Sequence, residues 1–321
     1  MSESTDNNTP LISIVIPVKN GISTIESCLD GIQKQTLFKQ CEIIVIDSGS
    51  ADGTLELVKN YPVRLVEIPP KAFNHGATRN FGVSLAKGEF VVMTVQDATP
   101  ADEFWLENMI RHFKDKEVAG VCGQQIVPHK KEYNPHLWFR PQSKPTIKSV
   151  QYTSKHEFLN LSPQDQRNAC GWDDVTAMYR KSCIVELPFQ PVMFGEDMIW
   201  AREALMAGHK LVYDNNVQVE HFHAHNPDFT YRRTLIAWLF IYKTFGFLRP
   251  KPYHLKDYLL IIYRNFNWGL PLKWIFHNWS ILWYVNKAVS TLQNSINNEE
   301  THLLEKKLSI NIPMGQSNST K

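Results

Sequence analysis

The first hundred residues alternate between short apolar runs and segments with helical spacing. The first apolar run is Ile12–Ile16, the further candidate strands are Glu42–Ile46, Val63–Ile68 and Phe90–Val95, and each is followed by a proline or a polar residue. A short apolar run such as Ile12–Ile16 is typical of a strand that is buried on both faces of a parallel sheet. We therefore expect four parallel strands in this part of the chain.

Three segments between these runs have helical patterns. In the first, Ser23 and Glu26 have the spacing of a capping box. Its apolar face would consist of Ile22, Ile25, Leu29 and Ile32. The inward-facing residues of the second helix and of the third, Asn74 to Lys87, would be Leu55, Val58, Ala77, Phe81 and Leu85. Because parallel strands need crossover connections, this order predicts an α/β fold with a mostly parallel, Rossmann-like sheet flanked by helices.

Polar residues follow three of the four expected strands. They are Lys19-Asn20 after the first, Asp47 after the second and Asp97 after the fourth. Ligands of open parallel sheets bind beyond the carboxyl ends of the strands. We therefore expect these separate loops to meet at one edge of the sheet and to form a binding site there.

The overall composition is that of an ordinary globular protein. The 321 residues are 43% hydrophobic and 21% charged, which excludes a disordered, collagen-like or coiled-coil chain. The net charge of +2 gives no reason to expect nucleic acid as a partner. The five scattered cysteines form no CxxC pair, which indicates a reducing compartment. Residues 1–10 lack the apolar core of a signal peptide and no long apolar run occurs, so we expect a cytoplasmic location.

Charge divides the chain into two regions. Residues 229–287 hold nine Lys and Arg and one acid, together with 17 of the 37 aromatic residues. The first 228 residues carry a net charge of −6. We therefore expect an α/β domain at 11–228, a basic aromatic helical region at 229–308, and disordered ends at 1–10 and 309–321.

Four motifs occur in a fixed order along the α/β region. They are Ile14–Asn20, Val45–Thr54, Asn74–Asn80 and the triplet Gly195-Glu196-Asp197. Together they resemble the family 2 glycosyltransferases, over roughly residues 11–225. The resemblance implies that residues 11–228 form a catalytic domain with the GT-A fold. The Asn74–Asn80 and Gln96–Pro100 segments particularly resemble bacterial rhamnosyltransferases.

The resemblance implies an inverting transferase. It would move a sugar from a nucleoside-diphosphate donor, with dTDP-rhamnose favoured, to a hydroxyl of a glycan or lipid-linked acceptor in bacterial surface polysaccharide synthesis. A sugar nucleotidyltransferase is a competing class, but Lys19-Asn20-Gly21-Ile22 is not the Gly-rich, Arg-containing loop that it would need. A second alternative is a nucleotide-binding or membrane-docked partner without catalysis.

The donor site can be assigned residue by residue from the resemblance. An Asp at a strand end can accept a hydrogen bond from the imide N–H of a base, and in the family the residue matching Asp47 contacts the base. The other donor-site residues implied are Pro17, Val18, Asn20, His75, Gly76 and Arg79. The alternative for Asp47 is a turn cap within Ser48–Ser50, and the alternative for Arg79 is a surface helix charge.

A diphosphate leaving group needs positive charge beside it, which metal ions commonly supply through carboxylate ligands. The family usually has Asp-x-Asp after the fourth strand, whereas this chain has Gln96-Asp97-Ala98. The resemblance implies that Asp97 binds Mg²⁺ or Mn²⁺ and that Gln96 touches the donor. His221 and His223 alternate, so on a strand both would point the same way as further metal ligands. The alternative is a pair of ordinary hydrogen-bonded histidines.

Transfer to a hydroxyl needs a general base. The triplet Gly195-Glu196-Asp197 matches the base motif of the family and precedes a helical pattern. The resemblance assigns Asp197 as the base, with Glu196 in reserve. A useful base at neutral pH must be partly buried or close to another acid. The alternative is a pair of acids that only favour the helix dipole.

In the stretch 127–171 the alternation of strand and helix patterns stops, and this stretch resembles an acceptor loop or lid. Its aromatic and basic residues include Tyr133, Trp138, Phe139 and Arg140. Beyond it, Trp172 would stack on a sugar, and Asp173 or Asp174 would accept hydrogen bonds from its hydroxyls. A buried core tryptophan is the equally weighted alternative for Trp172.

The C-terminal region contains two amphipathic patterns, Arg232–Phe247 and Lys273–Val285. Basic, Trp-rich amphipathic helices suit the headgroup boundary of an anionic membrane. Residues 232–285 are therefore a candidate for peripheral contact with the inner face of the cell membrane. The alternative is that they pack on the catalytic domain or on a second subunit of a homodimer.

Overall fold

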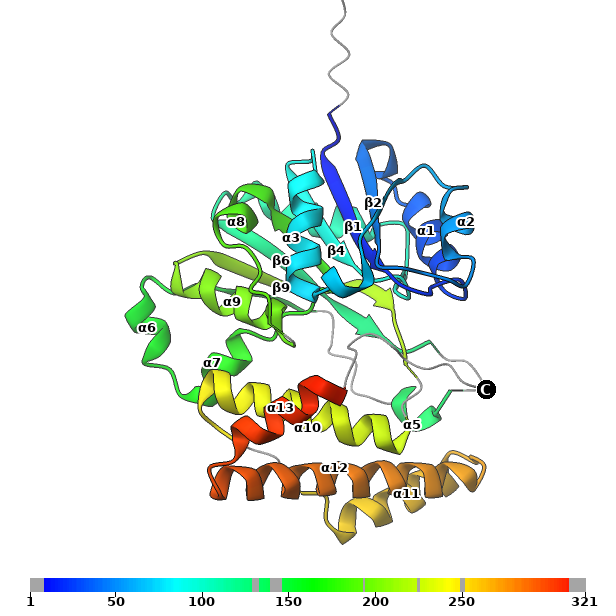
Figure 1. Ribbon diagram of the computed structural model, residues 1–321, viewed down its shortest axis with the longest axis vertical. Coiled ribbons are helices and arrows are strands. Elements are labelled where there is room, and N and C mark those ends of the chain that lie inside the picture. The colour runs from blue at the N-terminus through cyan, green and yellow to red at the C-terminus, as the bar shows by residue number, and fades with distance from the viewer. Residues whose placement is uncertain are drawn as a thin grey trace, which may run out of the picture.

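The computed structural model describes residues 9–128, 133–138, 146–192, 194–223, 226–248 and 252–311. One sheet of nine strands runs through these residues, with helices on both faces and a layer of helices beyond one end (Figure 1). The strands are β1 (Ile12–Val18), β2 (Cys41–Asp47), β3 (Arg64–Glu67), β4 (Phe90–Thr94), β5 (Thr99–Pro100), β6 (Val118–Ile126), β7 (Ile147–Val150), β8 (Thr176–Arg180) and β9 (Lys210–Glu220).

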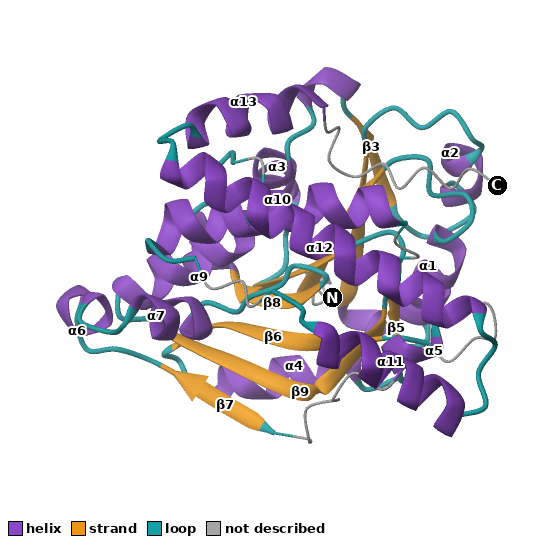
Figure 2. Ribbon diagram, turned by 90° about the horizontal axis from the view of Figure 1, so that it is seen from below, coloured by secondary structure: helices purple, strands orange, loops and turns teal. Residues whose placement is uncertain are grey.

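The four strands expected from the apolar runs form the parallel half of the sheet. Their order is β3-β2-β1-β4, and each neighbouring pair is parallel. Strand β8 then pairs antiparallel with both β4 and β6, and β9 runs parallel to β6. The two remaining strands, β5 and β7, pair antiparallel with β9 (Figure 2). The predicted α/β fold is confirmed, and the four expected strands are parallel, whereas the sheet as a whole is mixed because β8, β5 and β7 pair antiparallel with their neighbours.

Helices cover the two faces of the sheet with separate apolar cores. One core joins β1 residues Ile12, Ile14 and Ile16 to α1, α2 and α4, and the other joins Val15 of the same strand to α3, α8 and α9. This division follows from the alternation of side chains along a strand. The bounds are α1 (Ile25–Gln33), α2 (Thr54–Val58), α3 (His75–Leu85), α4 (Trp105–Ile110), α5 (Pro135–Trp138), α6 (Lys155–Leu159), α7 (Pro163–Ala169), α8 (Lys181–Glu186) and α9 (Glu196–Met206), with 3₁₀ turns at Phe38–Gln40, Pro70–Ala72 and Arg111–Lys114.

Two details of the expected helices are wrong. The first helix begins at Ile25 with Thr24 as its N-cap, so Ser23 forms no capping box, and Ile22 is exposed. Helix α3 turns the opposite face inward: Ala77 and Phe81 are exposed. The buried residues of α3 are Gly76, Thr78, Arg79, Gly82 and Val83. Close packing there requires a small residue, because a Cβ on Gly82 would lie 2.3 Å from Val15.

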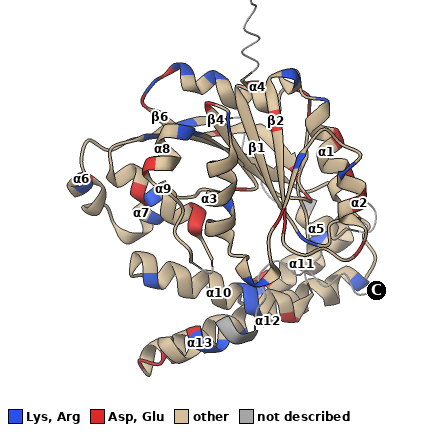
Figure 3. Ribbon diagram, turned by 45° about the horizontal axis from the view of Figure 1, so that its top comes forward, with Lys and Arg blue, Asp and Glu red and all other residues tan. Residues whose placement is uncertain are grey.

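Four helices form the layer beyond the sheet: α10 (Pro227–Phe245), α11 (Leu255–Asn267), α12 (Lys273–Asn297) and α13 (Thr301–Asn311). Lys and Arg positions are spread along this layer (Figure 3). It has its own apolar core, in which Leu235 and Leu239 of α10 pack with Ala288 and Leu292 of α12. None of the described helices is long and apolar enough to cross a membrane.

The layer begins two residues before the expected boundary at 229, because α10 starts at Pro227. Two of its helices, α11 and α13, have no counterpart in the predicted elements. Residues 309–311, expected to be disordered, form the end of α13. The other expected terminal tails lie outside the described residues, apart from Thr9 and Pro10.

Candidate active site

Three side chains from two loops gather at the carboxyl ends of β4 and β9. The Nε2 atoms of His221 and His223 each lie 3.3 Å from a carboxylate oxygen of Asp97. The possible ligand atoms of the three residues lie within 4.8 Å of one another. One carboxylate and two imidazoles in this arrangement fit a divalent cation such as Mn²⁺, for which oxygen and imidazole ligands are both suitable. The histidines lie just beyond the end of β9 rather than on it.

The electrostatics of this cluster suit a cation site. Burial alone would raise the pKa of Asp97, but the hydrogen bond from His221 and the charges of both histidines bring it below its ordinary value. Burial lowers the pKa of His223, with Asp97 opposing the change. A carboxylate that stays ionised and an imidazole that stays neutral are the forms that bind metal ions.

Gln125 on β6 connects the cation cluster to a further acid. Its Oε1 lies 2.7 Å from Nδ1 of His221, and its Nε2 donates a hydrogen bond to Asp173. A histidine that donates from Nδ1 presents Nε2 to a metal, so this contact fixes the ring in the ligating tautomer. The parallel pairing of β6 with β9 brings the glutamine and the histidine together. Spacing along the sequence gives no sign of this contact.

The two acids expected as the base lie at the start of α9 and have different surroundings. Asp197 is half-buried, and its carboxylate accepts hydrogen bonds from the backbone N–H of Asp174 at 3.4 Å and of Met198 at 2.7 Å. Burial, followed by the negative charges of Glu196 and Asp174, raises the pKa of Asp197 well above its ordinary value. An aspartate with a raised pKa is suited to accept a proton near neutral pH.

Glu196 belongs instead to a buried ion-pair network. Nη1 of Arg79 donates to Oε1 of Glu196 at 2.6 Å, and Nε of the same arginine lies 3.1 Å from Asp174. All three side chains are at most 8% exposed. Burial raises the pKa of Asp174 to about 7, although Arg79 and the hydroxyl of Tyr179 oppose the change. This network leaves Asp197, rather than Glu196, available to a hydroxyl.

Helix α3 holds the segment that leads into α9. Asn74 Nδ2 donates to the carbonyl of Val192 at 3.1 Å, and Asn80 exchanges two hydrogen bonds with the backbone of Phe189. A Cβ on Gly76 would lie 2.3 Å from the carbonyl oxygen of Gln190. The Asn74–Asn80 motif therefore positions the loop before Glu196. Its glycine is needed for this close approach, whereas the sequence placed Gly76 and His75 beside a nucleotide.

The residues expected around the base of the nucleotide lie together between β1 and β2. Asp47 accepts from the backbone N–H groups of Gly49 at 2.7 Å and Ser50 at 2.9 Å, and from the Ser50 hydroxyl. These contacts make Asp47 a turn cap, and its contact with a base stays a prediction. Asn20, with a positive φ of 49°, accepts from the N–H of Ala51 at 2.9 Å. Pro17 and Val18 pair with the end of β2.

Two residues assigned to the donor have other partners. The amide of Gln96 accepts from the N–H of Lys19 at 2.8 Å and donates to its carbonyl at 3.1 Å, which ties the ends of β4 and β1 together. Arg79 is neither a surface charge nor directed to solvent, because its guanidinium is buried between Glu196 and Asp174. In these contacts both side chains hold other parts of the site in position.

Trp172 is a core residue. It is 3% exposed, its Nε1 donates to the Tyr179 hydroxyl at 2.7 Å, and its ring packs against Trp200. Burial prevents it from stacking on a sugar, so that expectation is wrong, whereas Asp173 lies at the site. The described part of the stretch 127–171 contains α5, β7, α6 and α7. Phe139, Arg140 and the side chain of Trp138 lie outside the described residues.

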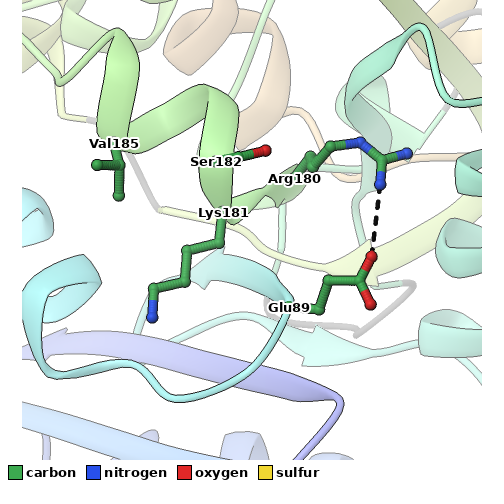
Figure 4. Close-up of a pocket in the computed structure, with 5 residues that line it drawn as sticks. All are labelled: Glu89, Arg180, Lys181, Ser182 and Val185. Carbon is green, nitrogen blue, oxygen red and sulfur yellow. Dashed lines mark ion pairs between the residues drawn. The ribbon is translucent and has the colours of Figure 1, made fainter.

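A hollow elsewhere on the surface is lined by Glu89, Arg180, Lys181, Ser182 and Val185 (Figure 4). It lies where β4 begins and β8 ends, at the opposite end of these strands from Asp97. Its charged groups already have partners: Arg180 pairs with Glu89 at 3.5 Å, and Lys181 donates to the carbonyl of Ala86 at 2.6 Å. The Asp97 end of the sheet is therefore the better candidate for an active site.

Comparison with known proteins shows which family and which sequences this chain resembles. The family model described as "Glycosyl transferase family 2" matches residues 13–184. The O-antigen chain rhamnosyltransferase RfbN of Salmonella typhimurium is 34% identical over 230 residues, covering 69% of each chain. The O-antigen chain rhamnosyltransferase WbaN of Salmonella anatum is 31% identical over 228 residues, covering 70% of each.

Solved structures share the fold at low sequence identity. The mannosyltransferase PcManGT from Pyrobaculum calidifontis, in complex with GDP-Man and Mn²⁺, aligns with a TM-score of 0.55 and 18% identity, covering 94% of this chain and 80% of that one. S. aureus TarS 1-349 in complex with UDP-GlcNAc aligns with a TM-score of 0.51 and 16% identity, covering 91% and 88%.

Proposed function

The chain belongs to glycosyltransferase family 2 and has a GT-A fold, and on this premise we propose that it is an inverting rhamnosyltransferase of bacterial surface polysaccharide synthesis. One observation carries the proposal for the site. A continuous set of contacts runs from Asp97 through His221 and Gln125 to Asp173, and the next residue, Asp174, contacts Asp197. One continuous set of contacts thus joins the candidate cation cluster to the candidate base.

The chemistry assigned to this chain is a single displacement. The acceptor hydroxyl oxygen forms a bond to the anomeric carbon while the bond from that carbon to the diphosphate oxygen breaks, and the hydroxyl proton passes to the carboxylate of Asp197. Asp173, to which Gln125 donates a hydrogen bond, would accept a hydrogen bond from the acceptor. Asp97, His221 and His223 would hold a divalent metal, which when bound neutralises charge on the departing diphosphate.

The donor assignment comes from the relatives. Both Salmonella proteins are named as O-antigen chain rhamnosyltransferases, which supports dTDP-rhamnose as the donor and a glycan or lipid-linked saccharide as the acceptor. Family membership and the Asp197 environment also favour a transferase over a nucleotidyltransferase or a silent binding partner. For the donor site, the proposal also includes that Pro17, Val18, Asn20 and Asp47 flank the nucleotide base.

A thermal-shift panel of nucleotide sugars, each with and without Mn²⁺, tests this function. A ligand that binds only the folded state raises the midpoint of unfolding. We expect dTDP-rhamnose to give the largest shift and to be consumed when a suitable acceptor is added. A larger shift with another sugar nucleotide would correct the donor, and the absence of any shift would contradict a donor site in the isolated chain.

The Asp47→Ala variant is expected to bind dTDP more weakly than the wild type, by roughly tenfold to a hundredfold, because a buried hydrogen bond to the base is lost. Isothermal titration calorimetry measures the change. Since Asp47 also caps a turn, Ser50→Ala serves as the control: it removes one turn contact and keeps the carboxylate. Equal weakening in both variants would assign the effect to the turn.

Chelation by EDTA is expected to abolish transfer, and added Mn²⁺ should restore it. Removing a ligand should weaken Mn²⁺ binding by at least roughly tenfold in His221→Ala and His223→Ala. Electron paramagnetic resonance of free Mn²⁺ measures this binding without substrate. His302→Ala, at an exposed position on α13, is the matched control. Full activity in EDTA, with unchanged Mn²⁺ binding in both variants, would remove the histidines from the site.

A further inference from the structure

Helix α11 exposes a continuous apolar stripe. Leu255, Leu259, Tyr263 and Phe266 are spaced four, four and three residues apart, which places them on one side of a helix. Their exposed fractions run from 54% to 74%. The opposite side of the helix is buried at Ile261 and Asn265. A surface helix that leaves a full stripe of large apolar side chains in solvent indicates an interaction site.

Helix α12 extends the same kind of surface. Phe276 is 67% and Trp283 53% exposed, and Leu272, just before the helix, is also exposed. The other side of α12 packs on α10 through Ala288 and Leu292. The two helices are joined to each other, since Trp279 Nε1 donates to the carbonyl of Tyr258 at 3.1 Å. In Figure 1, α11 and α12 form the part of the molecule farthest from the sheet.

The charges around the stripe favour one kind of occupant. Residues 252–298 contain four cations, Lys256, Arg264, Lys273 and Lys287, and a single acid, Asp257. That acid is occupied as the cap of α11, where it accepts from the N–H of His254 at 2.8 Å. Among the described residues, none of the four cations is in an ion pair. A second copy of the chain would bring like charges together, whereas anionic lipid headgroups would complement them.

We propose that α11 and α12 dock on the surface of an anionic lipid bilayer, with the stripe inserted at the headgroup boundary and the cations among the phosphates. Tyr263 and Trp283 suit this depth, because one end of each side chain is apolar and the other polar. The proposal moves the membrane contact from α10, whose apolar face is used by the core, to α11. It deepens the proposed function by explaining access to a lipid-linked acceptor.

The docked helices are bonded to the stretch expected to receive the acceptor. Asn134 and Asn278 exchange two side-chain hydrogen bonds, of 2.8 and 3.3 Å, and His136 lies 3.2 Å from Asn265. The ring of Tyr133 packs at 4.4 Å against Phe222, which lies between the two cluster histidines. These contacts join the lipid-facing layer to the candidate active site through residues 133–138.

Cosedimentation with lipid vesicles tests the proposal without any substrate. The full chain is expected to bind vesicles containing phosphatidylglycerol, more weakly at high salt, and not to bind pure phosphatidylcholine vesicles. The triple variant Leu259→Glu, Phe266→Glu and Phe276→Glu should lose at least roughly tenfold in partitioning. All three sites are exposed, so folding should be retained.

A second triple variant controls for the change in charge. Phe104→Glu, Ile147→Glu and Val185→Glu alter exposed apolar residues outside α11 and α12 by the same net charge, and vesicle binding should fall much less. Equal loss in both variants, or no binding by the wild type, would overturn the proposal. A dimer in solution that only the first variant disrupts, without vesicle binding, would assign the surface to a second copy. Donor-induced thermal shifts, measured separately, report on the proposed function.

Discussion

Asp197→Asn is expected to bind the donor as the wild type does and to lose transfer activity by roughly 10²- to 10⁴-fold, the usual contribution of a general base. An amide keeps the size of the side chain and its hydrogen-bond acceptor, but it cannot take the acceptor proton. Because the loss affects the chemical step, kcat and kcat/KM should fall together while the Kd for the nucleotide sugar is unchanged. Stopped assays and calorimetry separate the two quantities.

The pH profile gives the same experiment a second readout. Only the ionised aspartate is a base, so activity should fall as the pH drops through the pKa of Asp197. Since burial and Glu196 raise that pKa, the acidic limb should lie above the range of an ordinary aspartate. The residual activity of Asp197→Asn should lack this limb.

The variant Glu196→Gln decides between Asp197 and Glu196 as the base. Its control is Glu186→Gln, at an exposed position on α8, which should behave as the wild type. Glu196→Gln weakens the pair with Arg79 and should lower stability as well as activity. An active Asp197→Asn enzyme beside a folded, inactive Glu196→Gln enzyme would transfer the role of base to Glu196.

The parallel half of the fold could be predicted because its signal is local. Strand β1 is buried along nearly its whole length, so its sequence is apolar at every position except Ser13, a pattern that few other structures tolerate. The polar residues that follow such strands could be placed at one edge by topology alone. The same reasoning could not find β6, β8 and β9 in detail, because their order mixes parallel and antiparallel pairs that only tertiary contacts specify.

Helix α3 shows why the inward face could be misassigned. A search for apolar periodicity selects Ala77, Phe81 and Leu85, yet the buried face carries Thr78, Arg79 and Gly82. These residues are buried because glycine permits close packing and because the arginine is paired. The partners of Arg79 lie 95 and 117 residues further along the chain, so no local pattern indicates them.

Candidate chemistry was predictable where the residue type limits the role. Asp97 and the alternating His221 and His223 are metal-binding types, and the structure brings them together. Gln125 carries no such signal, because glutamine is common on exposed strands and its role depends on the register of β6 with β9. For Trp172 the sequence supported two roles equally, and burial decides in favour of the core.

Arg79→Met is expected to lower the free energy of unfolding at neutral pH by about 3–5 kcal/mol, the usual cost of breaking a buried ion pair by removing one partner. Methionine fills similar space, but it leaves Glu196, Asp174 and Asp197 close together without a cation. Urea denaturation followed by circular dichroism measures the change. Lys210→Met removes a pair with Asp115 in which both side chains are more accessible, 25% and 42%, and should have little effect.

The decrease in the free energy of unfolding caused by Arg79→Met should be larger at high pH than at low pH. Asp174 titrates at about 7 in the folded protein, against an ordinary value of 3.8, so this group destabilises the fold as the pH rises between these values. Without Arg79 its pKa should rise further, so the deficit relative to the wild type should be larger at pH 8 than at pH 5, where the carboxyl groups can be protonated. A deficit that is equal at both pH values would show that Arg79 stabilises the fold by packing alone. Normal stability with lost nucleotide binding would instead place Arg79 in the donor site, as its motif first suggested.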